Sequence, residues 1–355
     1  MKLRHPLSGA IYTLRDDGSV LVESNDGREG LFRDNGMWIE GELREADPHL
    51  LNFLAGPKIA SRRTTAGTKA RGSDAIASKT NHREQTTRRD DTAESKTDKR
   101  RKQMDLGLDG RKALVTAASR GIGLAIAQTL ADQGCDLAIC ARGEEGLESS
   151  RKDLESRGAK VFTRALDVSD GEALETFIRD AGEALDGLDI FVSNASAGGG
   201  PGLAGWQPAF DIDVMGAVRG IGAATPYLAK SDAGSVVIIS STAAVEYLGI
   251  PQGYSAMKAA LITHANDMSQ ALAPRGIRVN VVSPGPIYFE GGNWEMIKQA
   301  MPAMYEATLS QCAIGRMGTP EEVARAVVFL SSPAASLITG ANLVADGGFT
   351  KRAPF

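Results

Sequence analysis

The chain has 355 residues, of which 42% are hydrophobic, and a formal net charge of −4 at pH 7. This length accommodates one large domain and a smaller unit, and this charge does not indicate a nucleic-acid-binding protein. Cys135, Cys140 and Cys312 lack the spacing of a metal site or a redox motif, so we expect reduced thiols and no metal.

The N-terminus, MKLRHPLSGAIY, has no long apolar run, and no stretch of the chain approaches ~18 uninterrupted apolar residues. We therefore expect neither a signal peptide nor a membrane span. Together with the few cysteines, this predicts a cytoplasmic protein.

Short apolar runs alternate with turn signals in residues 1–58. The runs GAIYTL, SVLVES, EGLF and MWIEGEL are separated by RDDG, NDG and RDNG, and such Asp-Gly and Asn-Gly pairs are typical of hairpins. We expect a small β-meander domain of three to four antiparallel strands, followed by a short helix or apolar hook in ADPHLLNFLAGP. A unit this small has a marginal core, so docking on the larger domain, dimerisation and partner binding all stay open. The core candidates are Ile11, Val20, Val22, Leu31, Trp38 and Ile39.

Residues 59–103 contain almost no large apolar side chains, and Lys and Arg outnumber Asp and Glu. Such a segment cannot bury enough surface to offset its ordering entropy, so we expect a disordered basic linker. It is either a solvated spacer or a tether for nucleic acid or an acidic surface. Interspersed acidic residues and the lack of aromatic residues favour the spacer.

Residues 104–355 show a regular alternation of apolar strands and amphipathic helices. The strands KALVTA, CDLAICA, KVFTRALDV and LDIFVSNA are separated by helical segments, and SVVIISS, RVNVVSPG and ANLVADGG supply further strands. This alternation predicts the α/β class, with a Rossmann-type doubly wound parallel sheet covered by helices on both faces.

The first of these strands runs into TAASRGIG, residues 116–123, which opens a helix. Glycines there let the backbone approach a pyrophosphate, and the helix N-terminus offers free N–H groups. The second strand ends at Ala141 and Arg142, where an NAD site usually has an acidic residue. Arg120 and Arg142 suit a ribose 2′-phosphate, so NADP(H) is favoured over NAD(H). Alternatively, Arg142 is an exposed loop residue.

Lys258 follows Tyr254 by four residues, so a helix would place both side chains on one face. A positive charge beside a phenol favours its ionised form and suits it to proton transfer near neutral pH. Ser241 lies thirteen residues before Tyr254. The Tyr–Lys spacing alone also occurs on ordinary surface helices, so the interpretation depends on the accompanying motifs.

With these motifs in order, residues 106–355 resemble the short-chain dehydrogenase/reductase family, including 3-oxoacyl-[acyl-carrier-protein] reductases. The resemblance assigns catalysis to Ser241, Tyr254 and Lys258. It assigns the fourth catalytic position, normally Asn, to Asp213. The implied cofactor-binding residues are Thr116, Ser119, Arg120, Gly121, Ile122, Gly123, Arg142, Asp167, Val168, Asn194, Ala195, Tyr254, Lys258, Pro284, Gly285 and Ile287.

The resemblance implies hydride transfer between a nicotinamide and a ketone or secondary alcohol. Ser241 would donate a hydrogen bond to the developing alkoxide, and Tyr254 would deliver the proton. Lys258 would favour ionisation of Tyr254 and bind the nicotinamide ribose. The family also implies a small-molecule substrate and a homodimer or homotetramer.

The chain departs from the family pattern at several positions. Ala117 replaces a glycine, which is tolerable if its φ is negative, and Ser193 and Ser196 replace two residues of an NNAG stretch. Phe289 replaces a Thr that contacts the carboxamide. Asp213 either accepts hydrogen bonds from a relay water while adding a negative charge beside Lys258, or is a neutralised or salt-bridged structural carboxylate.

The segment 288–311 lies where the family carries its substrate lid, with glycines at 291 and 292 for hinge motion. Its apolar residues predict a fairly bulky apolar or 3-oxoacyl-type substrate, facing the loop 197–206, or else they pack the lid on its own core or on another subunit. They are Trp294, Met296, Met301, Met304 and Tyr305. The alternative function is a non-catalytic NADP(H)-binding sensor or scaffold that acts through the N-terminal module.

Overall fold

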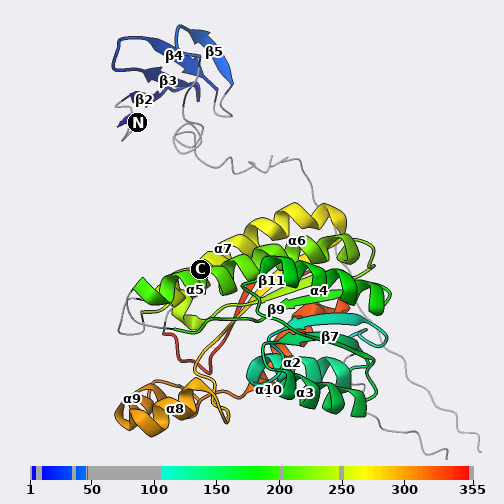
Figure 1. The fold of residues 1–355 in the computed structure, drawn as a ribbon. Helices are drawn as coiled ribbons and strands as arrows, with labels where there is room; N and C mark the ends of the chain where they lie inside the picture. Colours follow the sequence, from blue (N-terminus) through cyan, green and yellow to red (C-terminus); the bar gives the residue numbers. More distant parts are fainter. Residues whose placement is uncertain are drawn as a thin grey trace, which may run out of the picture. The chain divides into compact units, whose positions relative to one another are not determined.

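A computed structural model describes residues 2–4, 10–33, 37–44, 46, 105–199, 203–247 and 252–351. The chain divides into two units, Met1–Glu94 and Ser95–Phe355 (Figure 1). The expected linker at 59–103 and nearly all of the expected hook lie outside the described residues. The domain boundaries expected from the sequence therefore stay predictions.

The smaller unit is an antiparallel meander, as expected, in which each strand pairs with the next. A fifth strand was not foreseen, because β1 has a single apolar residue between two cations. The turns after β2 and β3 contain Gly18 and Gly27 with φ of 81° and 87°, a conformation that favours glycine. The strands are β1 (Lys2–Arg4), β2 (Ile11–Leu14), β3 (Val20–Glu23), β4 (Glu29–Phe32) and β5 (Trp38–Gly41).

The core of this meander differs in part from the expected one. Val20, Val22 and Leu31 are buried as predicted. Tyr12 is buried in place of Ile11, because Tyr12 pairs with Val22 and so shares its face. The prediction was wrong for Trp38 and Ile39, which lie on the edge strand β5 and are 41% and 40% exposed.

The larger unit is built on a parallel sheet with strand order β12-β11-β10-β9-β6-β7-β8. Chain order reverses between β6 and β9, which makes the carboxyl ends of these two strands a topological switch point. The strands are β6 (Lys112–Thr116), β7 (Asp136–Ala141), β8 (Val161–Ala165), β9 (Ile190–Ser193), β10 (Ser235–Ile239), β11 (Arg278–Pro284) and β12 (Asn342–Ala345).

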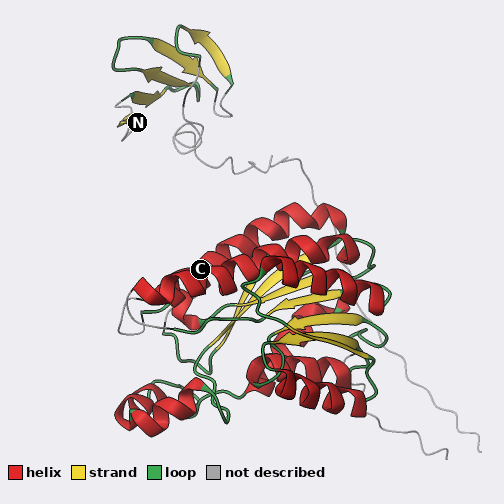
Figure 2. Cartoon of the chain, viewed as in Figure 1, coloured by secondary structure: helices red, strands yellow, loops and turns green. Residues whose placement is uncertain are grey.

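Helices cover both faces of the sheet, which confirms the predicted doubly wound fold (Figure 2). The α-helices are α2 (Gly121–Asp132), α3 (Glu144–Ser156), α4 (Gly171–Ala184), α5 (Trp206–Ala209), α6 (Gly216–Leu228), α7 (Gly253–Leu272), α8 (Asn293–Ala300), α9 (Pro302–Leu309) and α10 (Pro320–Ser331). A π-helical turn spans Phe210–Met215, and 3₁₀ helices span Leu203–Gly205, Thr242–Ala244, Ala273–Arg275 and Pro333–Ala335.

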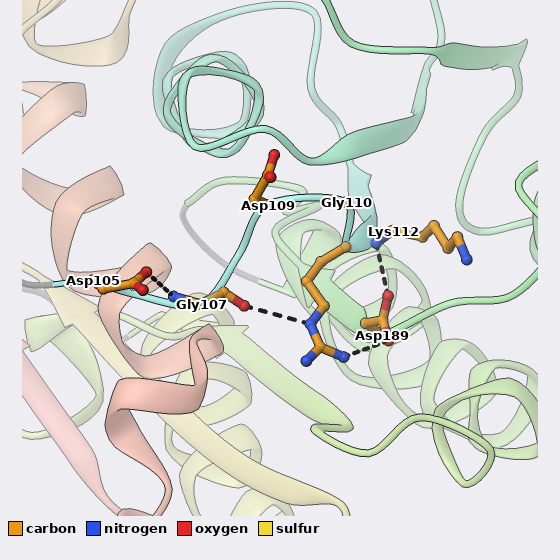
Figure 3. A pocket seen from close by; sticks show the side chains of 7 residues that line it. Asp105, Gly107, Asp109, Gly110, Lys112 and Asp189 are labelled. Atoms are coloured by element: carbon orange, nitrogen blue, oxygen red, sulfur yellow. Dashed lines mark hydrogen bonds and ion pairs between the residues drawn. The ribbon is translucent and has the colours of Figure 1, made fainter.

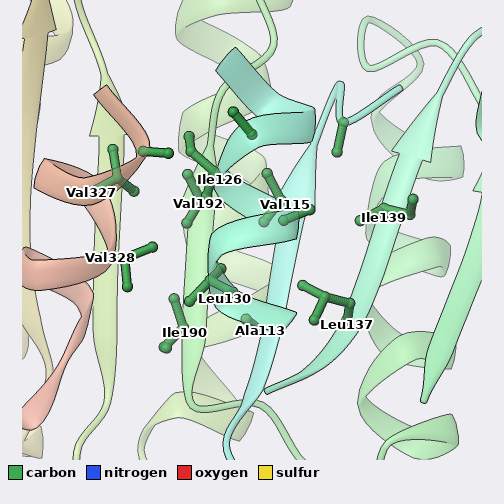
Figure 4. Packing of buried hydrophobic residues seen from close by; sticks show 14 of the residues in the cluster. Ala113, Val115, Ile126, Leu130, Leu137, Ile139, Ile190, Val192, Val327 and Val328 are labelled. Carbon is green, nitrogen blue, oxygen red and sulfur yellow. The ribbon is translucent and has the colours of Figure 1, made fainter. Parts of the chain in front are cut away.

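Successive residues of β6 pack on opposite faces of the sheet. Val115 lies in the core formed with Ile126 of α2 and Val327 of α10 (Figure 4), whereas Leu114 packs with the helices α4, α6 and α7 on the other face. Because both faces of the sheet are buried, the sequences of its strands are almost continuously apolar. Among the described residues, no helix combines the length and hydropathy of a membrane span.

Candidate active site

Tyr254 and Lys258 lie in the first two turns of α7, as their spacing predicted. The Lys258 ammonium is 5.7 Å from the centroid of the Tyr254 ring. Ser241 follows β10 and begins the 3₁₀ helix Thr242–Ala244, where its Oγ accepts a hydrogen bond from Ala243 N at 3.1 Å. The neighbouring Ser240 Oγ donates to the Lys258 carbonyl oxygen at 2.8 Å, which ties the end of β10 to α7.

Asp213 contacts Lys258 directly from the π-helical turn that precedes α6. Lys258 Nζ lies 3.0 Å from Asp213 Oδ1, and it also donates to the Ile239 carbonyl oxygen at 2.8 Å. The two side chains are 2% and 0% exposed. The structure therefore shows Asp213 as an ion-pair partner of Lys258, which is compatible with both arrangements that the sequence left open.

The two candidate hydroxyl groups have free hydrogen-bonding capacity. Within the described residues, the Tyr254 hydroxyl contacts no protein acceptor, and Ser241 Oγ accepts a hydrogen bond without donating one. Each of the two side chains therefore has an O–H group available to a ligand oxygen. This arrangement suits the stabilisation of negative charge that develops on a carbonyl oxygen.

The glycine loop is held in shape by the segment that follows β9. Thr116 Oγ1 accepts hydrogen bonds from Asn194 N at 2.9 Å and Ala195 N at 3.1 Å. Asn194 Nδ2 donates to the Thr116 and Ala117 carbonyl oxygens at 3.0 and 3.2 Å. A Cβ on Gly123 would lie 2.4 Å from both Ala117 O and Asn194 Nδ2, so only glycine fits there.

The start of α2 offers backbone N–H groups for an anion. Its N-cap residue, Arg120, has an extended backbone, and no side chain caps the helix. The first N–H groups of an uncapped helix lack acceptors, which suits them to a phosphate. Gly121 and Ile122 supply these groups together with Gly123.

Ala117 has a φ of 53°, in the left-handed region. The sequence argument tolerated this alanine only with a negative φ, so that condition is not met. The loop therefore carries a strain of ~1–2 kcal/mol at this residue.

We expect Ala117→Gly to raise the free energy of unfolding by ~0.5–1 kcal/mol, because relief of this strain exceeds the added chain entropy of glycine in the unfolded state. Urea unfolding checks this value. The matched control is Ala118→Gly, at a fully buried neighbour without a positive φ, which should lower stability. A loss of stability in Ala117→Gly would contradict the strain.

Arg142 lies near Asp167, at the end where the adenosine of a dinucleotide is expected. Hydrogen bonds from Ser169 N and Oγ, at 2.9 and 2.7 Å, lower the pKa of Asp167, and the charge of Arg142 adds to this effect. Arg120 is placed differently: its Nη1 donates to the Gly291 carbonyl oxygen at 2.9 Å. Arg120 thus contacts the lid segment, and the joint role of the two cations at one phosphate stays a prediction.

The segment after β11 covers the glycine loop. A Cβ on Gly121 would lie 2.6 Å from the Phe289 ring, and one on Gly285 would lie 2.6 Å from Asp346 Cβ. The Ile287 backbone bridges to Gly318. The contact between Phe289 and Gly121 could not be predicted from sequence, because it depends on how two segments that are distant in the chain pack together.

The lid segment contains α8 and α9, which lie side by side (Figure 1). Trp294 and Tyr305 pack against a small core of Cys312, Met317 and Phe349, so these two aromatic residues belong to the lid's own core. The three methionines remain 45–57% exposed and can form an adaptable apolar wall. They are Met296, Met301 and Met304.

Two hollows among the described residues lie away from Tyr254. One of about 350 Å³ lies at the amino ends of β6 and β9, where Lys112 N donates to Asp189 Oδ2 at 2.8 Å (Figure 3). Arg111 and Asp189, two of its charged groups, pair with each other at 3.4 Å. Another, of about 630 Å³, is lined by Tyr288, Tyr305 and the start of α10. We assign the candidate site from the contacts around Lys258 instead.

The described residues contain no group of His, Cys, Asp and Glu side chains arranged to hold a metal ion. Cys135, Cys140 and Cys312 are free and buried. Burial raises the pKa of Cys135 and of Cys140 to about 12, so neither thiol is a ready nucleophile.

Comparison with known proteins covers the larger unit. A family model described as "Enoyl-(Acyl carrier protein) reductase" matches residues 116–350. Isoepoxydon dehydrogenase patN of Penicillium expansum is 36% identical over 247 residues, which are 68% of this chain and 95% of that protein. The 3-oxoacyl-[acyl-carrier-protein] reductase FabG of Vibrio cholerae is 33% identical over 248 residues, which are 68% of this chain and 98% of that protein.

Solved structures agree with these relatives. L-Sorbose reductase from Gluconobacter frateurii, complexed with NADPH and L-sorbose, has a TM-score of 0.65 and 30% identity, over 70% of this chain and all of that one. A short-chain dehydrogenase from Burkholderia cenocepacia in complex with NADP has a TM-score of 0.63 and 32% identity, over 68% of this chain and 98% of that one.

Proposed function

The chain belongs to the short-chain dehydrogenase/reductase family of oxidoreductases, and we propose that it interconverts a ketone and a secondary alcohol with NADP(H). The observation that carries this proposal is the Tyr254 hydroxyl, which lacks a protein partner among the described residues and lies one helical turn from a buried Lys258.

The residues present fit a phosphorylated dinucleotide. The uncapped start of α2 lies at the switch point of the sheet, where Gly121, Ile122 and Gly123 present backbone N–H groups to a pyrophosphate. At the adenosine end, we propose that Arg142 offers a cation to a 2′-phosphate and that Asp167 and Val168 contact the adenine. Two solved relatives are described with NADPH or NADP.

The nicotinamide cofactor supplies or accepts the hydride when bound. In ketone reduction, Ser241 and Tyr254 bind the carbonyl oxygen through their O–H groups, and Tyr254 releases its proton to that oxygen. The Lys258 ammonium stabilises the phenolate that remains and offers an N–H group to the ribose. In alcohol oxidation, Tyr254 takes the proton instead.

For the substrate, we propose a fairly bulky apolar or 3-oxoacyl-type ketone. The exposed methionines of α8 and α9 support this, because flexible thioether side chains adapt to large apolar groups. FabG of Vibrio cholerae is a 3-oxoacyl-[acyl-carrier-protein] reductase by name, whereas the Gluconobacter frateurii enzyme is complexed with L-sorbose. A polar sugar is therefore the contrasting substrate class.

The test is a panel of ketones, ketoses and 3-oxoacyl thioesters, with NADPH oxidation followed in the full-length protein. We expect turnover with apolar or 3-oxoacyl ketones. Turnover restricted to ketoses would overturn the substrate class but leave the reaction standing. Binding of NADPH without turnover on any member would favour the sensor or scaffold instead.

Arg142→Ala should raise the dissociation constant for NADPH by about 10- to 100-fold, because a charge-assisted hydrogen bond to a phosphate is worth about 1.5–3 kcal/mol. The dissociation constant for NADH should change by less than about 2-fold, because NADH lacks the 2′-phosphate. Fluorescence titration with both cofactors measures this difference. Equal losses for NADPH and NADH would show that Arg142 does not select the phosphate.

We also propose a cytoplasmic location, from the few cysteines and the apolar pattern of the sequence, and a homodimer or homotetramer, from the family resemblance. We retain the expected division into a β module at 1–58, a linker at 59–103 and a catalytic domain at 104–355. Light scattering of the full-length chain measures the oligomeric state, and limited proteolysis tests the boundaries.

A further inference from the structure

Two positions at which this chain departs from the family pattern contact each other. Ser196 Oγ donates a hydrogen bond to Asp213 Oδ1 at 2.7 Å, although the two residues are 17 apart in sequence. Ala197 N donates to the other carboxylate oxygen, Oδ2, at 2.8 Å. With Lys258 Nζ at 3.0 Å, three donors converge on a carboxylate that is 0% exposed.

A carboxylate suits this position better than an amide. An ionised Asp offers about four acceptor sites and no donor, whereas Asn offers one oxygen and an NH₂ group. With Asn at 213, the NH₂ group would face one of the three donors, and a buried donor would lose its acceptor. Ser196 and Lys258 share Oδ1 while Ala197 N occupies Oδ2, so the three donors together require two acceptor oxygens, which accounts for an acidic residue at 213.

Ser196 also organises the turn that follows it. Its Oγ accepts a hydrogen bond from Gly198 N at 3.1 Å while its O–H points to Asp213. Hydrogen bonds from Ser196 and Ala197 thus fix the turn 196–198 against the Asp213 carboxylate. This turn follows Asn194 and Ala195, which hold the glycine loop.

The same carboxylate sets the direction of the Lys258 ammonium. Of its three N–H groups, one is directed to Asp213 and one to the Ile239 carbonyl oxygen. One is left for a ligand. Any displacement of Asp213 therefore changes where this last N–H group points and how far the ammonium lies from the Tyr254 ring.

We infer that Ser196 is a positioning residue that acts with Asp213 as a single unit, and that this unit orients Lys258 and the turn 196–198 beside Tyr254. The inference rests on the proposed function, because Lys258 matters for turnover only in an oxidoreductase. Ser196 itself contacts neither the reacting oxygen nor the hydride, and it works through Asp213.

The experiment is a double-mutant cycle with Ser196→Ala and Asp213→Asn in the full-length protein. We expect Ser196→Ala to lower kcat by about 10-fold and Asp213→Asn by about 100-fold, because hydrogen bonds to charged groups have effects of this order. The KM for the ketone should change by less than about 3-fold. The double variant should be no slower than Asp213→Asn alone, because Ser196 acts only through the carboxylate at 213.

Two further variants separate positioning from a general structural effect. Ser196→Thr keeps a hydroxyl and should retain kcat within about 2-fold. Ser231→Ala removes a similar contact, Ser231 Oγ to Asp189 Oδ1 at 2.5 Å, which lies before the amino ends of β9 and β10, whereas Ser241 follows the carboxyl end of β10; this variant should leave kcat unchanged. If Ser196→Thr were as slow as Ser196→Ala, the hydroxyl would not be the active feature and the inference would fail.

A measurement that does not need turnover completes the test. Hydrogen exchange in a peptide spanning 195–199 should be faster in Ser196→Ala than in wild type, because the carboxylate that holds Ala197 N is less fixed. The pairing would be overturned if hydrogen exchange in Ser196→Ala equalled that in wild type. It would also be overturned if the fold-losses in kcat of Ser196→Ala and Asp213→Asn multiplied in the double variant. Faster exchange in Ser196→Ala than in wild type, together with a wild-type protein that turns over no ketone, would keep the pairing and reject the proposed function.

Discussion

Tyr254→Phe is expected to lower kcat by about 10²- to 10⁴-fold while NADPH binding is retained, because general acid–base groups contribute on this order. The phenyl ring preserves the packing beside Lys258, whose ammonium lies 5.7 Å from the ring centroid. The variant lacks only the O–H group, so no side chain remains to deliver a proton to the ketone oxygen. Steady-state NADPH oxidation and fluorescence titration of NADPH measure the two effects separately.

Tyr227→Phe is the matched control for this variant. The Tyr227 hydroxyl donates to the Arg179 carbonyl oxygen at 3.2 Å, between α6 and α4, so its removal should leave kcat within about 2-fold of wild type. Intact turnover in Tyr254→Phe would show that another group moves the proton. Loss of NADPH binding in Tyr254→Phe would show instead that the hydroxyl acts on the cofactor.

Asp213→Ala should lower the free energy of unfolding by ~3–5 kcal/mol, since removal of one partner of a buried ion pair leaves an uncompensated charge. Lys258 is only 2% exposed, and without Asp213 its ammonium would keep a single acceptor, the Ile239 carbonyl oxygen. The donors on Ser196 and Ala197 would lose their acceptor as well. Urea unfolding without cofactor measures the loss.

The double variant Asp213→Leu, Lys258→Met distinguishes the charge from the volume of these side chains. Replacement of both charges by apolar groups of similar size should recover most of the lost stability, because neither desolvation cost remains. The double variant should nevertheless lack turnover, because no ammonium is left beside Tyr254. A variant Asp213→Ala that is as stable as wild type would contradict this prediction, because it would show that the Lys258 ammonium is compensated by other partners or by water.

Part of the candidate site was readable from short stretches of sequence. Lys258 follows Tyr254 by four residues, and the periodicity of a helix places them together regardless of the rest of the fold. The glycine loop was readable because it directly follows an apolar strand and opens a helix. The same local order predicted the antiparallel meander, from Asp-Gly turns between apolar runs.

Contacts between distant segments were not readable in this way. Arg120 donates to the Gly291 carbonyl oxygen, 171 residues away, a contact that no local pattern indicated. Ala117 seemed tolerable until its φ of 53° was known. Trp38 and Ile39 looked like core residues because of their type, but β5 is the last strand of its sheet, and both are about 40% exposed.

The sequence by itself determined the fold class, the order of the motifs and the identity of the Tyr–Lys pair, because these depend on residue type and on periodicity within one element. Only the tertiary structure decided that Asp213 is an ion-pair partner and that Ser196 donates to it. Hydrogen-bond geometry across 17 residues depends on how the π-helical turn before α6 packs against the loop after β9, and no local pattern encodes that packing.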